Sequence, residues 1–118
     1  MYGFPKNFDP DVFIGLTLEM ICFNFNQIYL HFDKQTSITI EATLTYQMAD
    51  GKEPLEISPP VLSSNLMGLL EHKVISATSQ SDGTLSLTFD NGHIVKCLDP
   101  EPNYESYKIS LGTTTIIV

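Results

Sequence analysis

A strict alternation of apolar and polar residues over residues 37–48 constrains the fold more than any other feature. Every second side chain from Ile38 to Met48 is apolar, and most of the residues between them are threonines. Because successive side chains of a β-strand point to opposite faces, the pattern predicts a strand with one buried and one solvent-facing side. The chain is therefore expected to build a sheet that covers a core.

Further strands are predicted on both sides of this segment. Residues 27–32 alternate in the same way and are joined to it by a polar turn at 33–36, which predicts a hairpin. The apolar run at 18–23 ends in turn residues and predicts a third strand. Beyond the middle of the chain, the same signals predict five more strands, at 73–79, 84–89, 93–98, 107–111 and 114–118.

The turns and connectors carry their own signals. The pair Asn91–Gly92 predicts a type I′ hairpin turn, in which both central residues need a positive φ. Residues 49–60 contain three prolines and an Asp-Gly step, so this stretch cannot continue a central strand and is expected to connect two halves. After it, Ser63, Ser64 and Asn65 could cap a short helix at 62–71.

The two halves of the chain show a weak internal repeat. Residues 28–33 (IYLHFD) match residues 85–90 (LSLTFD), and each is followed by a turn and an apolar strand. The repeats extend roughly over 13–48 and 66–98. Neither is long enough to bury its own hydrophobic face, so both should share one core. We expect a single domain over 1–118, mainly antiparallel β, built as two pseudo-repeated half-barrels or a small barrel or sandwich with one short helix.

Composition limits the classes of partner. The 118 residues suffice for one core, and the formal net charge is -8 because acids outnumber lysines and arginine is absent. Such a chain disfavours nucleic acid and anionic membranes and favours a basic protein. No apolar run approaches the roughly 20 residues of a membrane span, and no signal peptide is evident. With two widely spaced cysteines, Cys22 and Cys97, the expected compartment is the cytoplasm.

No catalytic signature is evident. Nucleophilic catalysis needs a Ser or Cys beside an oriented His, and nothing in the sequence marks such a set. The histidines at 31, 72 and 93 are scattered, and both cysteines lie in apolar strands, where a thiol usually packs as a small hydrophobe. We therefore expect no enzyme, no cofactor and no metal. A fold that gathered His31, His93 and Cys97 would reopen the question.

One segment, 98–107, combines three acids, two stiffening prolines and two tyrosines. A stiff, acidic and aromatic loop suits the recognition of a basic surface, because preorganisation lowers the ordering cost of binding. The alternative is an ordinary connector whose tyrosines plug the core. The candidate partner-binding residues are Asp99, Glu101, Tyr104, Glu105 and Tyr107.

The N-terminal aromatics form a second candidate surface. They are interleaved with Asp9 and Asp11, but the favoured interpretation is that they pack along the edge of a sheet. The residues concerned are Tyr2, Phe4, Phe8 and Phe13.

The second half also resembles a known but uncharacterised family of small bacterial domains. The motif residues are the hairpin Asp82-Gly-Thr-Leu-Ser-Leu-Thr-Phe-Asp-Asn-Gly92 and the element Tyr104-Glu-Ser-Tyr107. The family carries DGxLxLxFxxG followed by YExW, and Tyr107 stands where it usually has tryptophan. The resemblance implies no catalytic residues. In its acidity and size the chain is also similar to immunity proteins, including those of contact-dependent growth inhibition systems.

These observations lead to one functional expectation and one alternative. We expect an immunity protein that binds and neutralises a basic cognate toxin domain, a nuclease, as a 1:1 heterodimer, by occluding its active cleft. The alternative is a small-ligand binding or regulatory β-module that uses the mouth between the two halves.

Overall fold

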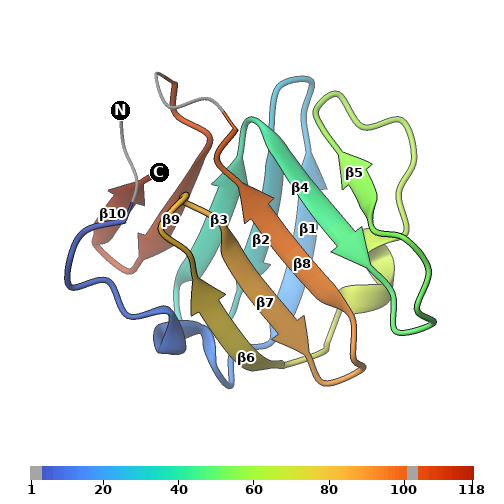
Figure 1. Cartoon of the computed structure of the whole chain (residues 1–118), viewed down its shortest axis with the longest axis horizontal. Helices are drawn as coiled ribbons and strands as arrows, with labels where there is room; N and C mark the ends of the chain where they lie inside the picture. Colours follow the sequence, from blue (N-terminus) through green and yellow to red (C-terminus); the bar gives the residue numbers. More distant parts are fainter. Residues whose placement is uncertain (1–3, 101–103) are drawn as a thin grey trace.

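The computed structural model describes residues 4–100 and 104–118 and is mainly β (Figure 1). Two short 3-10 helices, η1 (Pro10–Phe13) and η2 (Leu66–Leu69), accompany ten strands in this part of the chain. The strands are β1 (Leu18–Phe23), β2 (Ile28–Phe32), β3 (Thr36–Ile40), β4 (Thr43–Gln47), β5 (Leu55–Ile57), β6 (Val74–Ser79), β7 (Leu85–Phe89), β8 (Ile94–Leu98), β9 (Tyr107–Leu111) and β10 (Thr114–Ile117).

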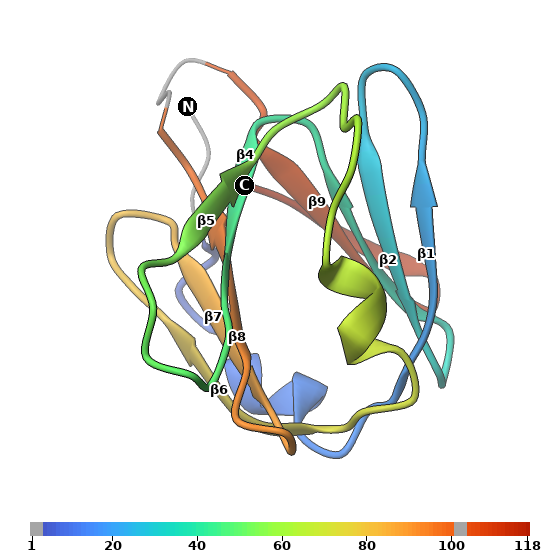
Figure 2. The same cartoon turned by 90° about the vertical axis from the view of Figure 1, so that its right-hand side faces the viewer.

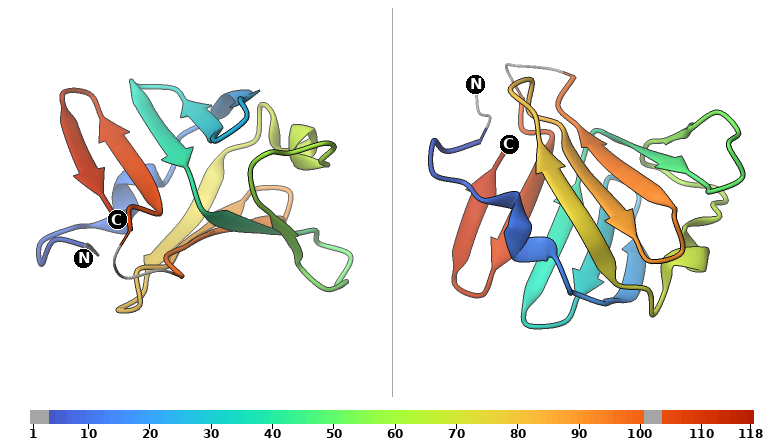
Figure 3. Two further views of the ribbon diagram at one scale, coloured as in Figure 1. Left: turned by 90° about the horizontal axis from the view of Figure 1, so that it is seen from above. Right: turned by 60° about the horizontal axis from the view of Figure 1, so that its bottom comes forward.

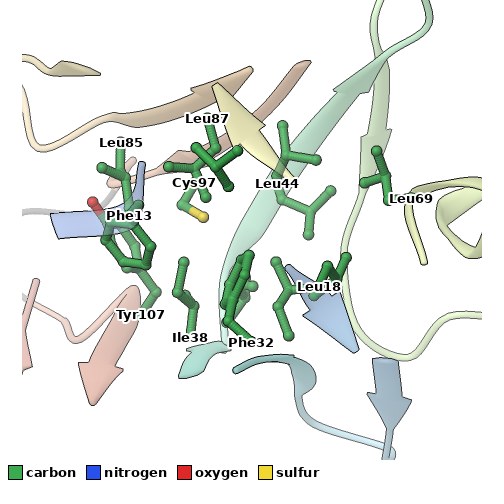
Figure 4. Close-up of a cluster of buried hydrophobic side chains, with 14 of the residues drawn as sticks. Phe13, Leu18, Phe32, Ile38, Leu44, Leu69, Leu85, Leu87, Cys97 and Tyr107 are labelled. Carbon is green, nitrogen blue, oxygen red and sulfur yellow. The ribbon is translucent and has the colours of Figure 1, made fainter. Parts of the chain in front are cut away.

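The strands form two antiparallel sheets that pack face to face as a sandwich, seen edge-on in Figure 2. One sheet has the order β1-β2-β3-β9-β10 and the other β5-β4-β8-β7-β6. Neither sheet closes on itself within the described residues, so the sandwich form of the predicted fold is the observed one. Alternate residues of both sheets point inward and are buried, and they meet η1 and η2 in one core (Figure 4).

The elements follow the same order in the two halves of the described chain. Each repeat runs 3-10 helix, three-stranded meander, then two more strands, from η1 to β5 and from η2 to β10. The last two strands of each repeat join the sheet of the other, because β9 pairs with β3 and β4 pairs with β8. The first strand of each meander even carries a bulge at the same place, after Leu18 and after Val74. The repeats therefore share one core by exchanging strands.

The strand predicted over 37–48 is wrong as a single element. It is two strands, β3 and β4, which belong to different sheets. At the corner between them, the amides of Glu41 and Ala42 both donate to the carbonyl oxygen of Ser106, at 2.9 and 3.0 Å. The alternation runs through this corner unbroken because both strands face the same core. Periodicity therefore could not reveal that the chain changes sheets.

Two other predictions need correction in the middle of the chain. The predicted helix at 62–71 is only the single 3-10 turn η2, for which Gly68 and the short apolar run leave little helical length. The predicted connector at 49–60 contains the strand β5, which pairs with β4 at the edge of its sheet. The three prolines of this connector, Pro54, Pro59 and Pro60, lie outside the strand, as the missing amide donors require.

The type I′ turn lies in the first repeat and not at Asn91–Gly92. Lys34 and Gln35 have φ values of 57° and 58°, and the amide of Thr36 donates to the Asp33 carbonyl. At the predicted place, only Gly92 has a positive φ, of 85°, and its amide donates to the Phe89 carbonyl at 2.9 Å. Gly92 thus ends a three-residue turn, a form that needs one left-handed residue and not two.

Candidate functional site

Several loops of the described chain emerge together at one end of the sandwich, the top in Figures 1 and 2. They are the turn at 24–27, the corner at 41–42, the segment at 58–62, and residues 99–100 and 104–106 of the β8–β9 connection. We call this set the loop end. Three of the five sequence-predicted binding residues, Asp99, Tyr104 and Glu105, belong to it, while Glu101 lies outside the described residues.

The loop end carries negative charge. Its described residues include Glu41, Asp99 and Glu105 but no lysine. Three acid-bearing turns of the opposite end differ, because a lysine follows closely in the turns at 33–34, 50–53 and 71–73. The loop end is therefore one place where the negative charge has no neighbouring lysine in sequence, and a basic surface would be attracted to it.

Tyr104 is the most accessible of the predicted residues, with 70% of its surface exposed. It is followed by Glu105, which is half-buried and lies beside the exposed Glu41. A hydrogen bond to Glu41 that only a protonated carboxyl group can make, together with desolvation and repulsion between the two carboxyl groups, raises the pKa of Glu105 above its ordinary value. Lys108 on β9 opposes the shift only weakly. The exposed Tyr104 thus directly precedes, in sequence, one of two acids that repel each other.

Asp99 and Tyr107 have structural roles that the sequence analysis left open. The Asp99 carboxylate accepts a hydrogen bond of 2.7 Å from the Ser106 hydroxyl and packs on Gly83. Tyr107 is 0% exposed and donates from its hydroxyl to the Gly83 carbonyl at 2.6 Å. Burial raises the pKa of Tyr107. The candidate role of Tyr107 in contacting a partner is therefore corrected, because this side chain plugs the core.

Two apolar residues of the loop end were missed by the sequence analysis. Phe25, at the tip of the β1–β2 turn, is 74% exposed, and Leu62, after the cis Pro59–Pro60 bond, is 98% exposed. Their loops lie side by side in both Figure 1 and Figure 2. The available signal was a large apolar residue within a turn sequence, where burial is not expected.

The other sequence candidates are dispersed or buried. Phe13 is buried in the core, and Phe4 and Phe8 stack at 4.9 Å and pack against it, as expected for the N-terminal aromatics; Tyr2 lies outside the described residues. Cys97 is buried, which raises its pKa to about 12, and the cysteine thiols are free. Within residues 4–100 and 104–118, no three His, Cys, Asp or Glu side chains gather as a metal site would require.

A cavity of about 200 Å³ opens beside β5, on the side of the sandwich that Figure 2 faces. Its walls come from β4, the β4–β5 loop and the residue before η2. The lining residues are Tyr46, Met48, Asp50, Lys52, Glu53, Leu55 and Asn65. The Tyr46 hydroxyl is hydrogen-bonded to His93 Nδ1 at 2.7 Å, and burial raises the pKa of this tyrosine.

Fold and site together define a class: an internally duplicated, strand-exchanged β-sandwich with an acidic, aromatic loop end. The chain belongs to a family of unknown function, DUF6188, whose model matches residues 11–118. No curated protein and no solved structure matches the chain. In the described part of the chain, neither helix has the length and apolar character needed to cross a membrane.

Proposed function

We propose that this protein is a cytoplasmic immunity protein that binds a basic toxin domain, a nuclease, one to one and occludes its active cleft. The observation that supports the proposal is the loop end, which presents the exposed Tyr104 and the interacting acids Glu105 and Glu41, with no lysine among its described residues. A nuclease cleft is positively charged because it holds phosphates, so an acidic projection matches it.

The loop end combines the two kinds of group that protein interfaces need. Tyr104, Phe25 and Leu62 are exposed apolar or aromatic side chains, which lose water on binding and can anchor the complex. The acids of the loop end supply steering, because opposite charges raise association rates toward roughly 10⁸ M⁻¹s⁻¹ at low salt. Glu41 and Glu105 also repel each other in the free protein, and a lysine or arginine of the partner would relieve that repulsion.

The first experiment tests neutralisation itself. The neighbouring gene would be expressed in a sensitive host with and without this protein. In parallel, this protein would be used as the bait in a pull-down from native cell lysate. We expect the neighbouring gene to arrest growth only when this protein is absent. We also expect the pull-down to recover the basic product of that gene. A neighbour that is harmless, or one whose toxicity this protein does not reduce, contradicts the proposal.

A second experiment locates the binding surface. The variants Tyr104→Ala and Glu41→Gln/Glu105→Gln change exposed groups of the loop end, and Asp99 is left intact because it holds Ser106. We expect the double variant to slow association by about tenfold at low salt and to flatten its salt dependence. Tyr104→Ala should speed dissociation, because an anchor is lost.

The matched control is Asp50→Asn/Glu53→Gln, which removes the same charge from the β4–β5 loop at the opposite end. Because long-range steering depends partly on net charge, this control should change association only slightly. If the control and the loop-end variant have equal effects, the loop end is not the binding surface.

A further inference from the structure

The exchange of strands leaves two open sides to the sandwich, one between β10 and β6 and one between β5 and β1. Each is covered by the segment that leads into a 3-10 helix. Residues 4–9 precede η1 and run beside β10, and residues 58–65 precede η2 and cross from β5 toward β1 (Figures 2 and 3). The two sides are equivalent under the internal repeat, so the side chains that pack in each can be compared directly.

On the first side, the chain fills its own space with aromatic rings. Phe4 and Phe8 stack in parallel at 4.9 Å, with 7° between their planes, and both pack against the core. Phe4 also meets Tyr107 edge-on at 6.5 Å. Ile116 on β10 is also partly buried and packs against the core.

On the second side, the residues that the structure describes form no aromatic pair like that of Phe4 and Phe8. Leu55 is the equivalent of Ile116, because it pairs with Tyr46 just as Ile116 pairs with Ile109. Leu55 is nevertheless 51% exposed. In segment 58–65, Val61 packs against the core but Leu62 points into solvent. The cavity of about 200 Å³ described above opens here, against Leu55 and Met48. The second side thus contains a space large enough for an aromatic ring, which residues 4–100 and 104–118 leave unfilled.

We infer that this cavity binds a single aromatic ring that carries a positively charged substituent. Leu55 and Met48 supply apolar lining suited to an aromatic face, and Tyr46 also lines the cavity. Asp50 and Glu53 outnumber Lys52 among the charged lining residues, which favours a cationic substituent over an anionic one. This inference does not rest on the proposed immunity function, because the cavity and the loop end are different surfaces.

The test titrates the full chain with benzylamine, phenylacetate and isobutylamine, observed through the methyl signals of Met48 and Leu55 by NMR. We expect benzylamine to shift both methyls with a Kd on the order of millimolar, as its size allows. Phenylacetate, with the opposite charge, and isobutylamine, without the ring, should each bind about tenfold more weakly. A short peptide with phenylalanine next to lysine, run in parallel, distinguishes a protein side chain from a free amine as the source of the ring.

The variant Leu55→Ala removes part of the apolar lining and should weaken benzylamine binding about fivefold. Ile117→Ala is the matched control, since Ile117 is also an exposed apolar residue of an edge strand but lies on β10, away from the cavity. Its affinity should equal that of the native chain. Unshifted Met48 and Leu55 methyls at about 20 mM benzylamine, or equal affinity for all three probes, would overturn the inference.

Discussion

At the scale of single residues, the tightest constraint in the described structure lies around Gly83. This glycine has a φ of +92°, and its carbonyl accepts the hydroxyl of the buried Tyr107. A β-carbon at this position would lie 2.5 Å from the Asp99 carboxylate. Gly83 therefore contacts both Asp99 and Tyr107, which were predicted to bind a partner. These contacts hold both side chains against the protein.

Gly83→Ala should be among the most destabilising single substitutions in the chain. The new methyl group would displace Asp99 from Ser106 and also hold alanine in a left-handed conformation, which together should lower the free energy of unfolding by roughly 3 kcal/mol. Gly51→Ala is the control, because Gly51 has a φ of +81° but nothing within 4 Å. It should lose only about 1 kcal/mol. Urea denaturation measures both, and equal losses would show that the Asp99 contact is unimportant.

At the scale of elements, the two equivalent turns of the repeats solve the same geometric problem differently. The β7–β8 turn places a glycine at its left-handed position, Gly92. The β2–β3 turn has two left-handed residues, Lys34 and Gln35, and neither is glycine. This turn also supports the neighbouring hairpin, because the amide of Gly112 donates to the Gln35 carbonyl at 2.9 Å. The β2–β3 turn therefore keeps this backbone conformation although its two left-handed residues are strained.

The double substitution Lys34→Asn/Gln35→Gly should therefore stabilise the protein. Asparagine and glycine adopt the left-handed region readily, so the free energy of unfolding should rise by roughly 1 kcal/mol, partly offset by the freer unfolded chain. Thermal unfolding would show a higher Tm. Gly92→Ala should have the opposite effect, since Gly92 has a φ of +85°. An unchanged or lower Tm for the double variant would contradict a strained type I′ turn.

At the scale of the whole molecule, a net charge of -8 makes stability depend on how the carboxyl groups are paired. Glu105 and Asp90 are shifted in opposite directions. The hydrogen bond with Glu41 raises the pKa of Glu105 above 4.5, whereas the hydrogen bond from His72 lowers the pKa of Asp90 below 3.8. The folded state therefore binds more protons than the unfolded state at Glu105 and fewer at Asp90.

Linkage gives these shifts opposite consequences. As pH rises from 4.5 through the raised pKa of Glu105, the folded state is progressively destabilised. The Glu105→Gln variant should therefore be more stable than the native chain at pH 7. Its free energy of unfolding should also depend less on pH above 4.5. The Asp90 contribution is present above pH 3.8 and lost below it, so Asp90→Asn should be less stable at pH 7. Denaturation midpoints between about pH 3 and 8 measure both slopes. Changes of the same sign would contradict this assignment.

The local alternation of apolar and polar residues was enough to predict the positions of most strands. Alternation placed β2, β7 and β8 within a residue or two, because burial on one face of a sheet imposes a period of two wherever a strand lies. The repeat was visible for the same reason, since equivalent strands need equivalent alternation. Alternation is blind, however, to the sheet that a strand joins, and so the break between β3 and β4 at Glu41 went unseen.

The sequence by itself thus determined a mainly β, internally repeated chain with an acidic surface. Only the tertiary structure decided which side chains remain at that surface. Tyr104 and Tyr107 are three residues apart in one segment, yet one is 70% exposed and the other 0%. The difference arises because β9 begins at Tyr107 and turns it toward the core and the Gly83 carbonyl, a contact 24 residues distant in sequence. Exposure is a property of packing between distant segments, which no local pattern records.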